Sequence, residues 1–167
     1  MSIVRFRDLK NIRKKHKDQK IVFCSGCFDL THAVHVLFFE GCKKLGDILV
    51  VMVGRDSNIK KTKGAGRPIF NEHVRLKIIA SLKPVDYCFL DMPSSKKEIL
   101  EKNLKAVFGD LNPDIYVVND DAFDLLFRKN LVKAHNVPMR VLKRSAPKKF
   151  GEISTTKIIE KVKRLKR

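Results

Sequence analysis

Two histidines that follow a glycine turn are the residues of this chain best suited to chemistry. The apolar run 21–24 predicts a short buried strand, Gly26 ends it, and helical periodicity begins after Thr31. His32 and His35 are three residues apart at the start of that helix, so their side chains point the same way. A helix N-terminus also offers unpaired N–H groups and a positive dipole end to an anion. The arrangement predicts a site that holds a phosphate chain.

By themselves, the two histidines have other interpretations. They could be capping or core residues, or a His-x-x-His metal pair, although the sequence offers no evident third ligand. Cys24 and Cys27 have the spacing of metal ligands or redox thiols, but no second close pair completes a zinc site. All four cysteines lie in or beside apolar stretches, which favours buried free thiols. We therefore predict no protein-bound metal.

Two further segments suit phosphate binding. The hydroxyl residues 154–156 precede the amphipathic segment 158–165, so they would cluster on the exposed N–H groups of a second helix start, with ordinary capping as the alternative. Segment 60–68 places four cations among glycines and a proline after a strand and its turn. We expect a mobile loop that closes over a phosphate substrate, with a solvated charged surface as the alternative. Neither a dinucleotide fingerprint nor a P-loop is present.

Apolar runs alternate with amphipathic segments along the chain. This pattern predicts an α/β fold, a Rossmann-like doubly wound parallel sheet with helices on both faces and a C-terminal helix. Ligands in such sheets bind beyond the carboxyl ends of the strands, where Gly26, Gly54 and Asn119 lie. The predicted strands are 21–24, 48–53, 87–90, 115–118 and 139–142; the predicted helices are 33–45, 72–82 with Asn71 as N-cap, 96–107, 122–135 and one that begins after Ser154.

Length and charge limit the possible partners. The 167 residues suit one domain, 20–167, preceded by a basic N-terminal helix or arm, 1–19. No apolar run approaches the roughly 18 residues of a membrane span, and no signal-peptide pattern is evident, so we expect a cytoplasmic protein without a membrane partner. Of the net charge of +18, residues 1–20 carry +6 and residues 140–167 carry +9. RNA or DNA could bind such termini, although two Tyr and no Trp supply little base stacking; a solubilising lysine-rich surface is the alternative.

The ordered motifs resemble the cytidylyltransferase-like nucleotidyltransferases, whose signature is a strand, G-x-F-D and then H-x-G-H. The resemblance covers roughly residues 20 to 160. The K-G-x-G-R-P loop and the G-C-F-D variant are most similar to bacterial heptose-phosphate adenylyltransferases, with features of archaeal FAD synthases and glycerol-3-phosphate cytidylyltransferases. The matching segments are Gly26-Cys27-Phe28-Asp29, His32-Ala33-Val34-His35, Lys44-Leu45-Gly46-Asp47, Val53-Gly54-Arg55-Asp56-Ser57, Lys63-Gly64-Ala65-Gly66-Arg67-Pro68-Ile69 with Arg75, Pro84-Val85-Asp86, and Ile153-Ser154-Thr155-Thr156-Lys157-Ile158.

The resemblance implies transfer of AMP or CMP from ATP or CTP to a phosphorylated small molecule, with release of pyrophosphate. Such chemistry needs positioning and charge neutralisation and no protein nucleophile. It implies catalytic roles for His32, His35 and Lys63, and Mg²⁺ held by the nucleotide's own oxygens, since no carboxylate cage is visible. A homodimer is a further expectation. Nucleotide contacts are implied for both histidines and for Cys27, Phe28, Lys61, Arg75, Asn119, Asp120, Ser154, Thr155 and Thr156.

The sequence departs from the family pattern at two places. Val34 replaces the glycine between the histidines, where a side chain would point toward the nucleotide, and valine adds three carbons and is stiff at χ1. Residues 149–152 replace an Arg-Thr pair of many relatives. The alternative functions are therefore a catalytically silent nucleotide-binding protein and a basic RNA- or DNA-binding protein. The enzyme hypothesis requires that the histidine pair and the Ser-Thr-Thr helix start face one cleft.

Overall fold

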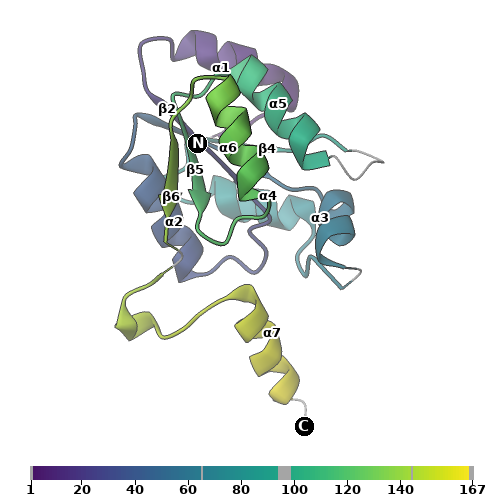
Figure 1. The fold of residues 1–167 in the computed structure, drawn as a ribbon. Helices are drawn as coiled ribbons and strands as arrows, with labels where there is room; N and C mark the ends of the chain where they lie inside the picture. Colours follow the sequence, from purple (N-terminus) through teal and green to yellow (C-terminus); the bar gives the residue numbers. More distant parts are fainter. Residues whose placement is uncertain (1, 65, 94–98, 144, 166–167) are drawn as a thin grey trace.

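A six-stranded, all-parallel sheet forms the centre of the molecule in the computed structural model, which describes residues 2–64, 66–93, 99–143 and 145–165 (Figure 1). The strand order is β1-β4-β3-β2-β5-β6. The strands are β1 (Ser2–Ile3), β2 (Ile21–Gly26), β3 (Ile48–Val53), β4 (Tyr87–Leu90), β5 (Ile115–Asn119) and β6 (Met139–Leu142). The α-helices are α1 (Leu9–Lys15), α2 (Ala33–Lys43), α3 (Asp56–Lys63), α4 (Glu72–Ala80), α5 (Ile99–Leu111), α6 (Leu125–Ala134) and α7 (Thr155–Arg164), with short 3-10 turns at Phe6–Asp8 and Lys148–Phe150.

Helices cover both faces of the sheet. Every residue of β3 is buried, as expected for a strand that alternates between two covered faces. One hydrophobic cluster joins the sheet to α1, α5 and α6, through residues such as Leu9, Phe108 and Leu131. The other joins it to α2 and α4, through Phe39 and Ile79. This is the doubly wound architecture that the alternation of elements predicts.

The strand order reverses between β2 and β5, and this reversal defines where a ligand can bind. From β2 the chain adds β3 and β4 on one side, then returns to place β5 and β6 on the other. β2 is paired with β3 along its whole length, from Ile21 opposite Ile48 to Gly26 opposite Val53. Gly26 and Asn119 therefore end neighbouring strands at the carboxyl edge, where loops diverge and leave a crevice.

Most predicted elements agree with the structure. The bounds of β3, β4 and β6 are those predicted, while β2 and β5 continue to Gly26 and Asn119. α2 and α4 each end two residues before their predicted ends, and α6 begins three residues late and ends one residue early. α5 ends at Leu111, four residues beyond its predicted end, and its predicted start, Lys96, lies outside the described residues. None of the helices in the described ranges is long and apolar enough to span a bilayer.

Two elements, β1 and α3, were not expected. β1 extends the sheet by pairing in parallel with β4. α1 agrees with the helix alternative predicted for the basic N-terminal segment, and it packs beside α5 (Figure 1). The predicted mobile loop over residues 60–68 is wrong in its first half, because α3 continues to Lys63 and ends only at Gly64, which has a φ of 92°. Lys60, Lys61 and Lys63 therefore come from a helix end, whereas Arg67 follows the helix.

Candidate active site

The turn between β2 and α2 has an unusual backbone that glycine makes possible. Phe28 and Leu30 have φ values of 51° and 46°, in the left-handed region. The Phe28 ring folds back over the end of β2, where a Cβ on Gly26 would lie only 2.7 Å from the ring. Glycine at this position is therefore a steric requirement of the turn. The turn delivers Asp29 and the two histidines to the carboxyl edge of the sheet.

Asp29 joins the three segments of the site. Its side chain is nearly inaccessible, and it accepts hydrogen bonds from the backbone N–H groups of Ile69 (2.8 Å) and Phe70 (3.0 Å). It also pairs with the Arg67 guanidinium at 3.0 Å. The backbone carbonyl of Asp29 accepts a 2.9 Å hydrogen bond from the hydroxyl group of Thr155, at the start of α7. The sequence motif contained Asp29, but the residue had been given no role.

The two histidines form a buried pair at the start of α2. His32 is the N-cap residue, and its backbone N–H donates to Nδ1 of His35 at 3.3 Å. The ring centroids are 4.1 Å apart, and the His35 ring meets the Phe28 ring edge-on. Because Nδ1 of His35 accepts a hydrogen bond, its ring proton lies on Nε2 in the neutral form. His35 can therefore present an N–H donor, and it lines a cavity at the carboxyl edge of the sheet.

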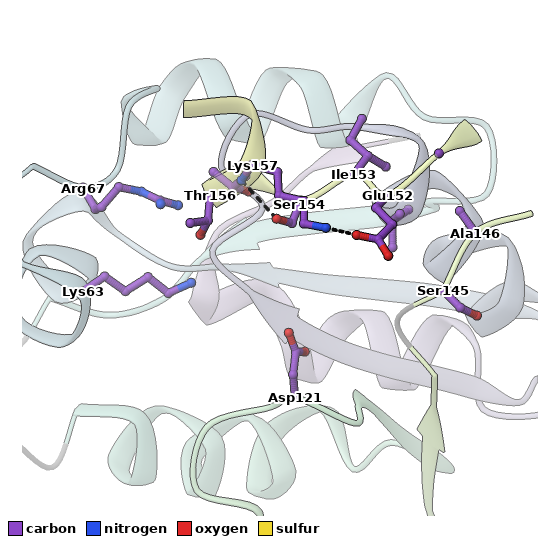
Figure 2. Close-up of a pocket in the computed structure, with 13 residues that line it drawn as sticks. Lys63, Arg67, Asp121, Ser145, Ala146, Glu152, Ile153, Ser154, Thr156 and Lys157 are labelled. Carbon is purple, nitrogen blue, oxygen red and sulfur yellow. Dashed lines mark hydrogen bonds and ion pairs between the residues drawn. The ribbon is translucent and has the colours of Figure 1, made fainter. Parts of the chain in front are cut away.

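Lys63, the last residue of α3, and Arg67, which follows that helix, bring positive charge to the cavity. Both residues line it, and Figure 2 shows their side chains extending toward the start of α7 from the opposite side. Lys61, which was predicted to bind the nucleotide, is exposed and is not among the described residues that line either cavity of the site. Arg67 was part of the loop motif but had no predicted role.

The start of α7 forms the other wall. Ser154 is the N-cap residue, and its hydroxyl group accepts from the Lys157 N–H at 3.2 Å. Thr155 is buried by its bond to Asp29, while Thr156 is exposed and lines the cavity. The N–H groups of the first helical turn have no partners within the helix, and the dipole is positive here. This wall is suited to an anion.

The histidine turn, through Val34 and His35, faces a common cleft with the Ser-Thr-Thr helix start, whereas His32 is not among the described residues that line either cavity. A cavity of about 640 Å³ is lined by Val34, Lys63, Arg67 and the α7 start. A second cavity of about 340 Å³ is lined by Cys27, Phe28, His35, Lys63 and Thr155, and reaches inward over the strand ends. Four residues, Lys63, Arg67, Asp121 and Thr155, line both cavities. Segments more than a hundred residues apart in the sequence thus surround one space.

Arg75 requires a correction, because its guanidinium group is not available to a phosphate. The residue is 0% exposed. Its nitrogen atoms donate to the carbonyl groups of Phe70 (2.9 Å), Cys27 (2.7 Å) and Gly54 (2.7 Å), and to the Asp56 carboxylate (2.7 Å). These bonds hold the loops after β2 and β3 together. Arg75 is a positioning residue for the site and not a nucleotide ligand.

The turn after β5 places a different aspartate at the site from the one predicted. Asn119 lines the inner cavity, as expected. Asp120 is not among the described residues that line either cavity, and its N–H is bonded to the Leu142 carbonyl at 3.1 Å. Asp121 lines both cavities and enters the larger one from below in Figure 2. The G-D-D-like turn contains both aspartates, and only the folded structure shows which of them lines the cavities.

The cysteines and acids do not form a metal centre in the described part of the chain, where no cluster of three or more His, Cys, Asp or Glu side chains occurs. All four cysteines are free thiols. Cys27 is half-buried beside the cavity, and burial raises the pKa of its thiol. Burial also raises the pKa of Cys88 to about 12. These thiols are protonated at neutral pH, which is unfavourable for metal binding.

Both departures from the family pattern lie on the larger cavity. Val34 is 6% exposed and forms part of the wall between the histidine turn and the α7 start. Glu152, in the segment that replaces the Arg-Thr pair, forms an ion pair with Lys157 (Figure 2). That pair lowers the pKa of the exposed Glu152 carboxyl group. This segment of the cavity wall therefore carries a paired carboxylate and ammonium group.

The fold is that of an α/β protein of the nucleotidyltransferase type: a parallel sheet whose strand order reverses, with the histidine turn and the start of α7 on either side of one cleft. The family model described as Cytidylyltransferase-like matches residues 23–161. The chain belongs to this family. The match spans both motifs that form the cleft, and it supports an enzyme of the nucleotidyltransferase kind.

Similar proteins agree with this assignment. The chain is 36% identical over 151 residues to the bifunctional protein HldE of Helicobacter pylori strain G27, covering 90% of this chain and 29% of that protein. It is 34% identical over 147 residues to HldE of Azotobacter vinelandii. The chain thus spans less than a third of the length of these curated relatives.

Solved structures show the same fold. A lipopolysaccharide core biosynthesis protein from Thermoplasma volcanium GSS1 superposes with a TM-score of 0.59 and 29% identity, covering 77% of this chain and 98% of that one. A pantoate-beta-alanine ligase from Francisella tularensis superposes with a TM-score of 0.64, covering 98% of this chain and 77% of the ligase. The ligase is only 18% identical, so it supports the fold alone.

Proposed function

We propose that this protein transfers a nucleotidyl group from ATP or CTP to a phosphorylated sugar or similar small molecule, with release of pyrophosphate. One observation supports this most strongly: the histidine turn and the α7 start line adjoining cavities that share Lys63, Arg67 and Thr155. The similarity to HldE and to a lipopolysaccharide core biosynthesis protein favours a sugar phosphate as acceptor. We place AMP first among the transferred groups, on the resemblance to adenylyltransferases.

The chain's own residues fit the charge changes of such a reaction. A phosphate oxygen of the acceptor attacks the α-phosphorus, and negative charge grows on the transferred group and on the leaving pyrophosphate. The Nε2–H of His35 and the ammonium group of Lys63 would donate to these oxygens as the charge develops. The backbone N–H groups at the start of α7 would hold the β- and γ-phosphates. Arg75 and Asp29 would keep the three segments in register, because both connect loops of the site.

Mg²⁺ fits this arrangement as a partner of the nucleotide. The described residues include no cluster of three candidate ligands, so the ion would be held mainly by phosphate oxygens. Asp121, which lines both cavities, is the carboxylate placed to contribute one protein oxygen. When bound, Mg²⁺ would neutralise part of the triphosphate charge.

The direct test measures pyrophosphate release. Purified protein is incubated with Mg²⁺, with ATP or CTP, and with a panel of sugar 1-phosphates and other phosphorylated acceptors, and the nucleotidyl product is identified by mass spectrometry. We expect turnover that needs both substrates and that falls about 10²- to 10³-fold when a donor to the transferred phosphate is removed. Nucleotide binding without turnover over the whole panel would count against an enzyme.

A second candidate function rests on Val34. This side chain lines the cavity in a position where the family has glycine, so it could displace the nucleotide, and a shift of about 1 Å can lower a rate roughly 10²-fold. The protein would then be a nucleotide-binding module with little or no catalysis. Val34→Gly separates the possibilities. A larger thermal shift with ATP and a higher turnover than wild type would support displacement, whereas equal values would show that the site accommodates valine.

The basic termini motivate a control with nucleic acid. Fluorescence anisotropy with a short single-stranded RNA at two salt concentrations measures any polynucleotide binding. Under the enzyme proposal, ATP competes with whatever binds at the cleft, and the His32→Ala, His35→Ala double variant loses nucleotide affinity. Tight, salt-sensitive RNA binding that survives the double variant would instead indicate a nucleic-acid-binding protein.

A further inference from the structure

We propose that Arg128 and Ser25 form a second anion subsite in the inner cavity, which binds a phosphate or carboxylate group of the acceptor other than the phosphate that reacts. The inference rests on the proposed function, because it assigns the acceptor to the inner cavity. Its substrate class is a hydroxylated small molecule with two anionic groups. Neither residue was singled out by the sequence motifs.

The guanidinium group of Arg128 is fixed in place on one side only. Arg128 is 6% exposed and lines the inner cavity. Its Nε donates to the Phe123 carbonyl at 2.8 Å, and its Nη1 donates to the Tyr116 hydroxyl group and, at 3.4 Å, to that of Ser25. Nη2 forms no hydrogen bond with a described residue, and it is not among the fully enclosed unpartnered atoms. Nη2 therefore faces the open space of the cavity.

The charge of Arg128 is not balanced by the protein. No carboxylate within the described ranges forms an ion pair with it. Burial lowers the pKa of Arg128 to about 10, and no acidic neighbour opposes this shift. A buried cation without a counter-charge is unfavourable, and it is usually paired or ligand-bound. An anion entering the cavity would supply the missing partner in a forked geometry that guanidinium suits.

Ser25 adds a second donor on the same wall. Its hydroxyl oxygen lies 3.3 Å from that of Tyr116, whose own oxygen accepts from Arg128. Either hydroxyl group can donate in this contact, and the Ser25 oxygen also accepts from Arg128. When Tyr116 donates, the Ser25 proton is left to donate into the cavity that Ser25 lines. Ser25 and Arg128 can then act as two donors to the same anion.

The rest of the inner cavity suits hydroxyl groups. Asn58 and Asn119 line it, and each has a buried side-chain carbonyl oxygen without a donor among the described residues. Asn58 is 5% exposed, so this missing bond is not made to bulk water. Unpaired buried acceptors favour a ligand with O–H donors. The volume of about 340 Å³ is also in the range of small-molecule sites, at its lower end.

Matched acceptors test the subsite by binding alone. Isothermal titration calorimetry, with a non-hydrolysable ATP analogue and Mg²⁺ present, compares glucose 1-phosphate, glucose 1,6-bisphosphate and glucuronic acid 1-phosphate. We expect one or both doubly anionic sugars to bind about tenfold or more tightly than the monophosphate. Which of the two binds better distinguishes a phosphate from a carboxylate. Equal affinity for all three, or no binding of any, would overturn the proposal.

Variants assign the preference to Arg128. In Arg128→Gln the preference for a doubly anionic sugar should disappear, while nucleotide affinity stays within about threefold of wild type; Arg128→Lys should keep part of the preference, because the charge remains. Lys129→Gln removes an exposed charge from the next position of α6 and should change neither. If Arg128→Gln unfolds, Ser25→Ala should still weaken the preference.

The binding result does not depend on turnover. Loss of pyrophosphate release with an intact preference would contradict the proposed function and leave the subsite standing. An Arg128→Gln variant that weakens all three sugars equally would show that Arg128 only supports the fold.

Discussion

Two buried arginines illustrate how similar side chains serve different purposes in this molecule. In the Arg75 network, which comprises Arg75, Asp56 and the carbonyl groups of Phe70, Cys27 and Gly54, all three guanidinium nitrogens are bonded within the protein. In the Arg128 wall, formed by Arg128, Tyr116 and Ser25, one nitrogen faces a cavity and no carboxylate balances the charge. The first arrangement is complete as folded. The second becomes complete only with a ligand.

The difference shows that burial alone does not identify a binding residue. Arg75 is less exposed than Arg128, and both follow helix starts near the carboxyl edge of the sheet. The two arginines differ in whether every guanidinium nitrogen has a hydrogen-bond partner within the protein. The same criterion can be applied to other residues near the cleft. It separates residues that hold the loops together from residues whose polar atoms remain for the substrate.

The largest expected effect comes from breaking the Arg75 network. Arg75→Met leaves the Asp56 carboxylate and three carbonyl groups without their donor, so we expect a loss of about 3–5 kcal/mol in the free energy of unfolding. Urea unfolding monitored by circular dichroism measures it. Lys77→Gln, an exposed cation on α4, should have little effect. A stable Arg75→Met protein that binds nucleotide poorly would restore the phosphate-contact role that the sequence indicated.

The next effect should fall on catalysis without a comparable effect on stability. In His35→Asn the amide oxygen can accept from the His32 N–H in place of Nδ1, but the Nε2–H donor is lost. We expect kcat to fall about 10²- to 10³-fold while the free energy of unfolding changes by about 1 kcal/mol or less. Pyrophosphate release and urea unfolding are the measurements. His73→Asn, an exposed histidine on α4, is the matched control. Equal kcat for the two variants would remove His35 from the reaction.

Thr155 supports the Asp29 loop and also lines the cavities. Its substitution should therefore have a smaller effect, shared between the stability of the protein and the binding of the nucleotide. Thr155→Val keeps the shape but leaves the Asp29 carbonyl without its donor, which typically costs about 1–3 kcal/mol for a buried group. We expect a higher KM for the nucleotide, because α7 is less firmly placed, together with modest destabilisation. Thr156→Val, on the exposed neighbour, should raise KM without lowering stability. The prediction is wrong if both variants have the same melting temperature.

Cys27 provides the mildest test, since its carbonyl belongs to the Arg75 network and the residue lines the inner cavity. Of the four cysteines it alone is not fully buried. Burial raises its pKa, so the reactive thiolate forms only at alkaline pH and the alkylation rate should increase from pH 7 to pH 10. Iodoacetamide labelling followed by mass spectrometry measures it, with Cys27→Ser as the blank. ATP with Mg²⁺ should slow the labelling of Cys27. An unchanged labelling rate would show that the nucleotide does not bind in this cavity.

Patterns within single segments predicted most of the fold. β3, β4 and β6 are short apolar runs with clear ends, and their bounds were predicted correctly. Asn71 caps α4 as expected, by accepting from two backbone N–H groups at 3.0 Å. β1 could not be predicted, because two residues carry no periodicity and its pairing with β4 joins distant segments. α3 could not either, since its lysines and threonine show no apolar stripe.

The parts of the site that belong to known motifs could be predicted from the sequence. The role of a residue could not be predicted where it depends on its hydrogen-bond partners in the folded chain. The convergence of the histidine turn with the α7 start followed from the resemblance and was confirmed. The motifs indicated Arg75 and not Arg128 as a ligand residue, because sequence does not show which carbonyl groups surround each guanidinium group. Asp29 was visible in its motif, but only the folded chain shows that it connects three segments. The periodicity of a sequence predicts local helices and strands, but it does not show which distant segments are joined by hydrogen bonds.

The contact between Asp29 and Thr155 has a consequence for how the cleft opens. It joins segments that are 126 residues apart in the sequence, so the sheet from β2 to β6 can stay folded while α7 separates from it. A molecule with α7 undocked would be folded yet unable to retain a triphosphate. Docking of this one helix would then switch the cleft between a releasing and a retaining form.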